Sequence, residues 1–136
     1  MKALSIDPVY SMLIFAGQKT IECRTWRTDY RGDILICSTK HLIKDTIPSH
    51  ALCVVRLADV VPFEKKHLDA ACMEPGDYQK GLYAWMLDDL RIIRPFAVKG
   101  KLSLWECDHD IEIIPEPETE EEDAQLYHEI WEPLFT

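Results

Sequence analysis

Apolar and polar residues alternate, or form short apolar runs, along most of the chain, which is the pattern of β-strands. The expected strands are 2–6, 20–26, 34–38, 50–61, 82–87, 91–96, 102–107 and 111–114. The run 34–38 is almost entirely apolar, which predicts a central strand buried on both faces. Polar turns such as 29–33 and 74–77 separate the runs. The pattern predicts a fold that is mainly β, a small barrel of about six strands.

Short helices interrupt the strand pattern. Asp7 and Pro8 are typical of a helix start, with Asp7 as the N-cap and Pro8 at the first helical position. The apolar residues that follow at helical spacing are Val9, Met12, Leu13 and Ala16, and Gly17 stands where a glycine commonly ends a helix. A second amphipathic helix is expected over 64–73. The fold class is therefore α+β, with two or three short helices beside the barrel.

Residues 116–136 differ in composition from the rest of the chain. The stretch 116–123 is acidic, and Thr119 with Glu122 forms a capping box that starts a helix. The apolar residues Tyr127, Ile130, Trp131 and Leu134 share one face of that helix. We expect a barrel domain over 1–115, followed over 116–136 by an acidic linker and a C-terminal amphipathic helix that is not a separate domain. The helix docks either on its own barrel or on a protein partner.

The net charge of −9 comes almost entirely from the C-terminal segment. Residues 116–136 hold eight acids and no lysine or arginine, whereas residues 1–115 are close to neutral at −1. This distribution does not indicate the broad basic surface that many nucleic-acid-binding proteins carry, but it is compatible with a local site for an anionic ligand.

Cysteine and histidine patterns argue against several kinds of site. The five cysteines form no Cys-x-x-Cys pair and the five histidines share no metal-ligand spacing, so we expect reduced thiols, no metal and no cofactor. No apolar run is long enough to span a bilayer, and the N-terminus lacks the architecture of a signal peptide. These features predict a cytoplasmic protein that does not contact a membrane.

The most unusual stretch is 17–33, which combines bases, acids and a tryptophan directly after the first expected helix. Its charged and aromatic residues include Lys19, Glu22, Arg24, Trp26, Arg27 and Arg31. In a strand, alternation places Glu22, Arg24 and Trp26 on one face and the apolar neighbours on the other. Two interpretations fit this arrangement: an exposed edge strand with salt bridges, or the floor of a ligand site.

Two blocks of sequence carry a resemblance to a known family. The first is Ala16-Gly17-Gln18-Lys19-Thr20-Ile21-Glu22-Cys23-Arg24-Thr25-Trp26, followed by Tyr30-Arg31-Gly32. The second is Tyr83-Ala84-Trp85 with Leu87, then Arg91-Ile92-Ile93 and Pro95, then Val98-Lys99-Gly100-Lys101-Leu102 with Leu104-Trp105. In this order the blocks resemble the signature of ASCH domains. The resemblance covers 2–114 and implies a PUA-like small β-barrel, similar to the RNA-binding PUA domains.

The resemblance implies a cleft, floored by the strand from Lys19 to Arg24, that faces RNA or a nucleotide-like small molecule. The family pattern matches Gly17, Lys19, Glu22 and Arg24. In that cleft, Lys19 and Arg24 would donate to phosphate or carbonyl oxygens, and Glu22 would accept from an exocyclic amine. The other residues expected to bind the ligand are Trp26, Arg27, Arg31, Tyr83 and Trp85. Their aromatic members would stack on a base, with core packing as the alternative.

Some ASCH proteins resembling the minimal form hydrolyse the acetyl amide of N4-acetylcytidine, which implies a second interpretation. Their motif reads Gly-x-Lys-Thr-x-Thr-x-Arg; Lys19 matches its lysine, but Glu22 replaces its second threonine. An amidohydrolase cleaving a C–N bond would here need Glu22 to activate water beside Lys19, with Glu74 as a candidate for a later carboxylate. Three functions stay open: a module binding RNA or a modified nucleoside, a small amidohydrolase, and a protein-interaction module acting through 116–136.

Overall fold

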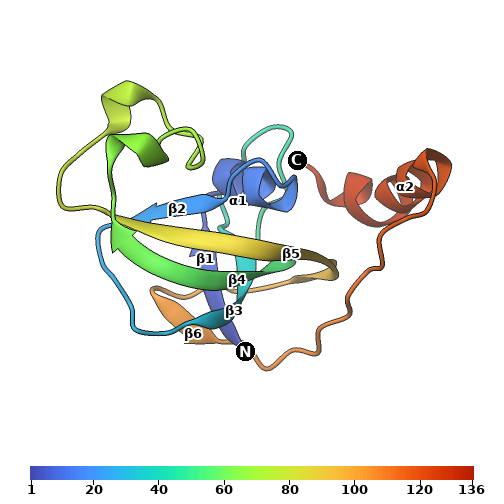
Figure 1. The fold of residues 1–136 in the computed structure, drawn as a ribbon. Helices are drawn as coiled ribbons and strands as arrows, with labels where there is room; N and C mark the ends of the chain where they lie inside the picture. The colour runs from blue at the N-terminus through green and yellow to red at the C-terminus, as the bar shows by residue number, and fades with distance from the viewer.

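The computed structural model describes residues 1–136 and contains one curled, six-stranded sheet (Figure 1). The strands are β1 (Lys2–Ile6), β2 (Ile21–Arg24), β3 (Gly32–Ser38), β4 (His50–Pro62), β5 (Tyr83–Ala97) and β6 (Leu104–Glu106). They pair in the order β2-β5-β4-β3-β1-β6, and every pair is antiparallel except β1 with β3. This half-barrel confirms the predicted fold class, α+β and mainly β.

The strands β3 and β4 form the centre of the sheet because their apolar runs are buried on both faces. No side chain of 34–37 or 51–55 is more than 2% exposed. The strand β5 is continuous over fifteen residues, although the sequence predicted two strands here. It stays paired with β4 through register shifts, including one between Leu57 and Asp59, and such bulges increase the curl of a sheet.

Several predicted element bounds were wrong. The strand expected over 20–26 ends at Arg24, and the strand expected over 111–114 makes only an isolated bridge to β5. The helix expected over 64–73 is reduced to the 3-10 turn η1 (Lys65–His67), and a second 3-10 turn, η2 (Pro75–Asp77), follows. The His67 ring accepts a hydrogen bond of 3.0 Å from the Glu64 backbone N–H, a capping contact at the start of this turn.

The first helix, α1 (Pro8–Phe15), begins as the sequence predicts. The Asp7 carboxylate accepts a hydrogen bond from the Val9 backbone N–H at 3.1 Å. Gly17 follows the helix with φ at 79°, the left-handed region that favours glycine. The face that α1 buries differs from the expected one: Pro8, Ser11 and Ile14 point into the protein, while Val9 and Ala16 are exposed.

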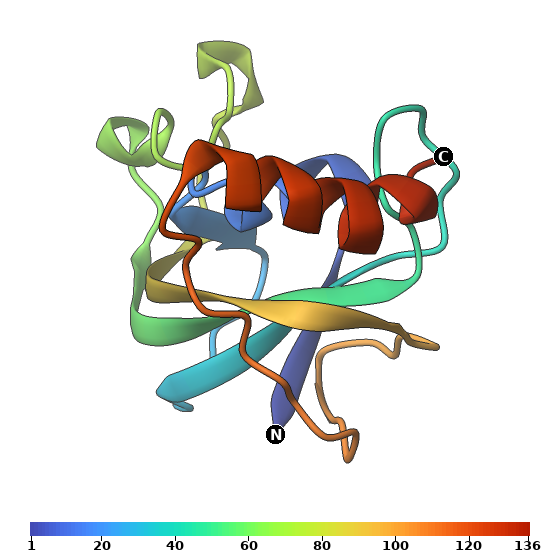
Figure 2. The same cartoon turned by 90° about the vertical axis from the view of Figure 1, so that its right-hand side faces the viewer.

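The chain ends in a helical segment that crosses the barrel beside β5 and α1 (Figure 2). It consists of α2 (Glu120–Leu126), a π-helical turn η3 (Tyr127–Trp131) and a 3-10 turn η4 (Glu132–Leu134). Thr119 caps α2 by accepting from the Glu122 backbone N–H at 3.1 Å. No helix of the structure combines the length and apolar character needed to cross a membrane.

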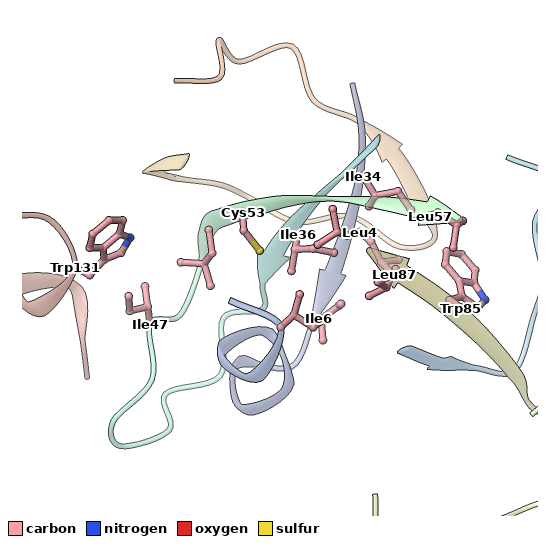
Figure 3. Close-up of a cluster of buried hydrophobic side chains, with 13 residues drawn as sticks. Leu4, Ile6, Ile34, Ile36, Ile47, Cys53, Leu57, Trp85, Leu87 and Trp131 are labelled. Atoms are coloured by element: carbon pink, nitrogen blue, oxygen red, sulfur yellow. The ribbon is translucent and has the colours of Figure 1, made fainter. Parts of the chain in front are cut away.

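Trp131 fixes this segment to the core. Its side chain is 6% exposed and belongs to the same buried cluster as Ile47 and Trp85, with the two tryptophans at opposite ends (Figure 3). The Trp131 ring packs against Phe15 of α1 with 5.6 Å between ring centroids. At the end of the chain, Thr136 makes two backbone hydrogen bonds of 2.9 Å, to the loop 39–49. The C-terminal segment is therefore packed on its own barrel.

Candidate ligand site

Lys19 is buried, with only 2% of its surface exposed, although its side chain ends in an amine. Its Nζ donates a hydrogen bond of 2.6 Å to the Ala71 carbonyl and lies 3.6 Å from Glu22 Oε1. The same nitrogen lies 4.9 Å from the centre of the Tyr10 ring, within range of a cation–π contact. These contacts replace part of the hydration that the ammonium loses on burial.

Glu22 lies on β2 and is 6% exposed. One carboxylate oxygen accepts from the Cys23 backbone N–H at 3.0 Å and faces Lys19, while the other accepts from Arg24 Nη2 at 3.2 Å. A buried carboxylate thus stands between two cations, which is the arrangement that makes burial of an acid tolerable.

Arg24 ties this ion-pair chain to the centre of the sheet. Its Nη2 donates both to Glu22 and to the Ser5 carbonyl of β1, the latter at 3.1 Å. Its Nε is buried and has no hydrogen-bond partner. The guanidinium is therefore held at one end and keeps an unsatisfied donor, which is uncommon for a buried polar atom.

The three charged side chains open onto one cavity of about 300 Å³. Its walls come from β1, the start of α1, β2 and the loop before η2, and are lined by Ile6, Asp7, Tyr10, Lys19, Glu22, Cys23, Arg24 and Met73. We call this the Lys19 cavity. It offers hydrogen-bond donors from Lys19 and Arg24, an acceptor from Glu22, and an aromatic wall from Tyr10.

Burial has a chemical effect on Lys19. Removing the ammonium from water lowers the pKa of Lys19 below its usual 10.5, and the neighbouring Glu22 carboxylate opposes part of that fall. A lysine with a lowered pKa is closer to its neutral, nucleophilic form at neutral pH than an exposed one is.

The structure does not bring all of the predicted ligand residues to this cavity. Trp85 is completely buried, packs edge-to-face on Trp26 at 4.7 Å between centroids, and donates to the Trp26 carbonyl at 3.2 Å. No face of its ring is open to a ligand, so we assign Trp85 to the core. Arg31 is exposed and pairs with Asp59 at 3.4 Å. Neither tryptophan nor Arg31 lines the Lys19 cavity.

The remaining predicted residues also lie outside the cavity. Arg27 is exposed without an ion-pair partner, and Tyr83 is half-buried on β5 opposite Arg24. Glu74, the candidate later carboxylate, is exposed and does not line the cavity, although its neighbour Met73 does. The structure therefore separates Lys19, Glu22 and Arg24 from the rest of the predicted set.

Sequence reasoning missed five residues of the cavity: Ile6, Asp7, Tyr10, Cys23 and Met73. Tyr10 carries a signal in the sequence, because it is an aromatic residue with a polar tip on the helix immediately before Lys19. Met73 carries none, because it reaches the cavity through the fold of 63–82. No group of three or more His, Cys, Asp or Glu side chains in the structure is placed to hold a metal ion.

The ASCH domain family model matches residues 4–117 of this chain. Because the match covers most of the chain, the protein belongs to the ASCH domain family. A comparison with curated proteins gives no match.

Solved structures show the same fold. The crystal structure of the ASCH protein from Zymomonas mobilis is similar, with a TM-score of 0.62, 17% identity and 93% of each chain covered. A variant of that protein with tyrosine changed to phenylalanine has a TM-score of 0.62 and 17% identity, covering 93% of this chain and 96% of its own. A variant with serine changed to alanine has a TM-score of 0.63 and 16% identity, covering 95% of each chain. At this identity the likeness describes the fold.

Proposed function

We propose that this ASCH domain binds RNA or a modified nucleoside in the Lys19 cavity. The observation that carries the proposal is the convergence of Lys19, Glu22 and Arg24, linked at 3.6 and 3.2 Å, on one cavity of about 300 Å³. A nucleobase presents carbonyl acceptors and exocyclic amine donors on its edges, and these three side chains offer the matching groups. The cavity volume lies at the lower end of the range for small-ligand sites, about 300–1,000 Å³.

The other predicted residues take a secondary place in this proposal. Arg27 is an exposed and unpaired cation outside the cavity, so it would meet a phosphate of a longer RNA and not the buried base. We propose that Trp26, Arg31 and Tyr83 likewise contact a longer RNA outside the cavity. Trp85 is left out because it is fully buried.

The first test compares variants of the cavity with a matched control. We expect Lys19→Met and Arg24→Ala each to weaken binding about tenfold or more, since each removes a charged donor to the ligand. The matched control is Arg94→Ala, which removes an exposed arginine paired with Glu112, away from the cavity. The measurement is titration calorimetry with nucleosides, including acylated cytidines, and with short RNAs at low salt, after circular dichroism has shown that each variant is folded.

Two results would count against the proposal. One is that no nucleoside or RNA binds or raises the thermal midpoint, because a ligand specific for the native state must raise it. The other is that Arg94→Ala weakens binding as much as the cavity variants do, which would place the ligand elsewhere.

A hydrolytic function is the second candidate, and one observation favours it. Burial lowers the pKa of Lys19, and Glu22 Oε1 lies 3.6 Å from its amine. Glu22 as a general base and Lys19 as a hydrogen-bond donor therefore face the same cavity. If the protein cleaves the amide of an acylated nucleoside, Glu22→Gln should reduce turnover at least about 100-fold in protein that circular dichroism shows to be folded. The control is Glu74→Gln, an exposed acid outside the cavity. Intact N4-acetylcytidine after long incubation with the wild-type protein, followed by chromatography, would exclude that substrate.

We propose the domain boundaries that the sequence predicts: residues 1–115 form the domain, and residues 116–136 are a segment attached to it. Trp131 occupies the core and Ile130 and Leu134 pack against the same cluster, so most of the apolar face is covered by the barrel, while Tyr127 is 43% exposed. A protein partner would then meet the acidic stretch 116–123.

A further inference from the structure

A second cavity, of about 470 Å³, shares Arg24 with the Lys19 cavity and is lined by the ends of β1 and β3 and the loop 98–103. Four of its lining residues are cations: Arg24, Lys40, Lys99 and Lys101. No aspartate or glutamate lines it. In a chain with a net charge of −9, a cavity with four bases and no acid is a local concentration of positive charge. We call it the basic groove.

The three lysines of the basic groove have no acid partner, whereas Arg24 is paired with Glu22. Elsewhere in the protein the arginines on the strands have acid partners, such as Arg56 with Asp88 at 2.6 Å and Arg91 with Asp33 at 2.6 Å. By contrast, Lys40, Lys99 and Lys101 form no ion pair. All three are exposed, so an incoming anion could reach them without displacing a partner.

Unsatisfied polar atoms point to the same place. The structure has three buried side-chain polar atoms without a hydrogen-bond partner, and two of them, Arg24 Nε and Thr39 Oγ1, belong to residues that line the basic groove. Native proteins rarely leave such atoms unpaired, and when they do a missing partner is one common reason. An anion oxygen that reached Arg24 Nε would supply the partner that this N–H lacks, while Nη2 kept its bonds to Glu22 and Ser5.

The loop 98–103 is held close to β1, so the lysines are not on a free tail. A Cβ added to Gly100 would lie 2.6 Å from Ser5 Oγ, which shows how closely the loop backbone approaches the strand. The Val98 backbone N–H donates to the Ser49 carbonyl at 2.9 Å. This anchoring places Lys99 and Lys101 on either side of the contact and limits the entropy lost when they bind an anion.

We propose that the basic groove binds a phosphate group of the ligand whose nucleoside part occupies the Lys19 cavity, an inference that rests on the proposed function. Arg24 lines both cavities and would contact the ligand at the junction. The planar guanidinium suits phosphate oxygens, and Lys99 and Lys101 add point charges on the far side. The phosphate belongs either to a free nucleoside monophosphate or to the backbone of an RNA.

The test uses the full chain and compares Lys99→Ala/Lys101→Ala with a matched double control, Lys44→Ala/Lys80→Ala. The control removes two exposed, unpaired lysines that do not line the groove. The probes are the common ribonucleosides, their 5′-monophosphates, short single-stranded RNAs and inorganic phosphate. We expect the groove variant to lose about tenfold in affinity for the phosphorylated probes and little for the nucleosides. The slope of the logarithm of the RNA binding constant against the logarithm of the salt concentration should become less steep by about 1.4. Two phosphate contacts are lost, and each contributes roughly 0.7 to the slope.

The outcomes separate this inference from the function on which it rests. If RNA or monophosphates bind wild type and groove variant equally, the groove inference is overturned while the Lys19 cavity stands. If nucleosides and RNA fail to bind but inorganic phosphate shifts the amide resonances of 98–103, the phosphate site is supported and the proposed function fails. If the wild-type protein prefers RNA to the monophosphate and only the groove variant loses this preference, the phosphate comes from the RNA backbone. If the wild-type protein binds both equally, the phosphate is that of the free nucleotide.

Discussion

Replacing Trp131 by alanine should lower the free energy of unfolding by about 3–5 kcal/mol, the usual cost of truncating a buried tryptophan. The ring is 6% exposed and packs against Phe15 and the main core cluster, so its removal opens a cavity that neighbouring side chains cannot fill. No hydrogen bond adds to this cost, because the indole nitrogen has no partner in the structure. Urea denaturation followed by far-ultraviolet circular dichroism measures the change.

Tyr127→Ala is the matched control, since it truncates an aromatic residue in the same helical segment that is 43% exposed. We expect that change to lower the free energy of unfolding by no more than about 1 kcal/mol. If Trp131→Ala costs as little as the control, the C-terminal segment is not docked in solution. Its apolar face would then be free for a protein partner.

The parts of the fold that the sequence predicted depend on neighbours along the chain. Asp7 caps α1 through the backbone of Val9, and Thr119 caps α2 through the backbone of Glu122. Gly17 takes the positive φ that a helix end requires. Each of these signals acts over two or three residues, so it can be found without knowing which strands pair.

The parts that were wrong depend on partners far along the chain. The strand β5 continues through residues 88–90 because β4 pairs with it, including Arg56 opposite Asp88. Trp85 is buried because its strand crosses the core, which its aromatic neighbours in sequence do not reveal. The main bond of Lys19 is to the Ala71 carbonyl, 52 residues away, so neither its burial nor Met73 in its cavity could be foreseen from local pattern.

The stretch 17–33 shows both kinds of behaviour. Alternation correctly placed Glu22 and Arg24 together, and the structure links them at 3.2 Å. Trp26 left that face because β2 ends at Arg24 and the chain turns away. An exposed edge strand with salt bridges does not describe the result, since Lys19 and Glu22 are 2% and 6% exposed. The strand is at the edge of the sheet, but its charges are buried beside a cavity.

That burial makes Glu22→Gln the second change with a large expected effect. The variant leaves Lys19 buried without a carboxylate, and breaking a buried pair on one side costs about 3–5 kcal/mol. Arg24 loses the same partner but is half-buried and keeps the Ser5 carbonyl, so Lys19 dominates the loss. We expect the double variant Lys19→Met/Glu22→Gln to be more stable than Glu22→Gln alone, because it no longer buries an unpaired ammonium.

The pH dependence of the loss identifies its cause. Burial already lowers the pKa of Lys19 below 10.5, and removing the Glu22 charge takes away a contribution that raises it, so the pKa falls further in Glu22→Gln. Consider a pH between the pKa of Lys19 in the folded variant and its pKa in the folded wild type. There Lys19 is protonated in the unfolded chain and in the folded wild type, but not in the folded variant. The free energy of unfolding of the variant therefore rises with pH, while that of the wild type does not. The difference in free energy of unfolding between wild type and Glu22→Gln should therefore be largest at neutral pH and become smaller toward pH 10. Urea denaturation at each pH measures this difference. A deficit that stays constant over this range, and persists in the double variant, would assign the effect to lost packing instead of to the buried charge.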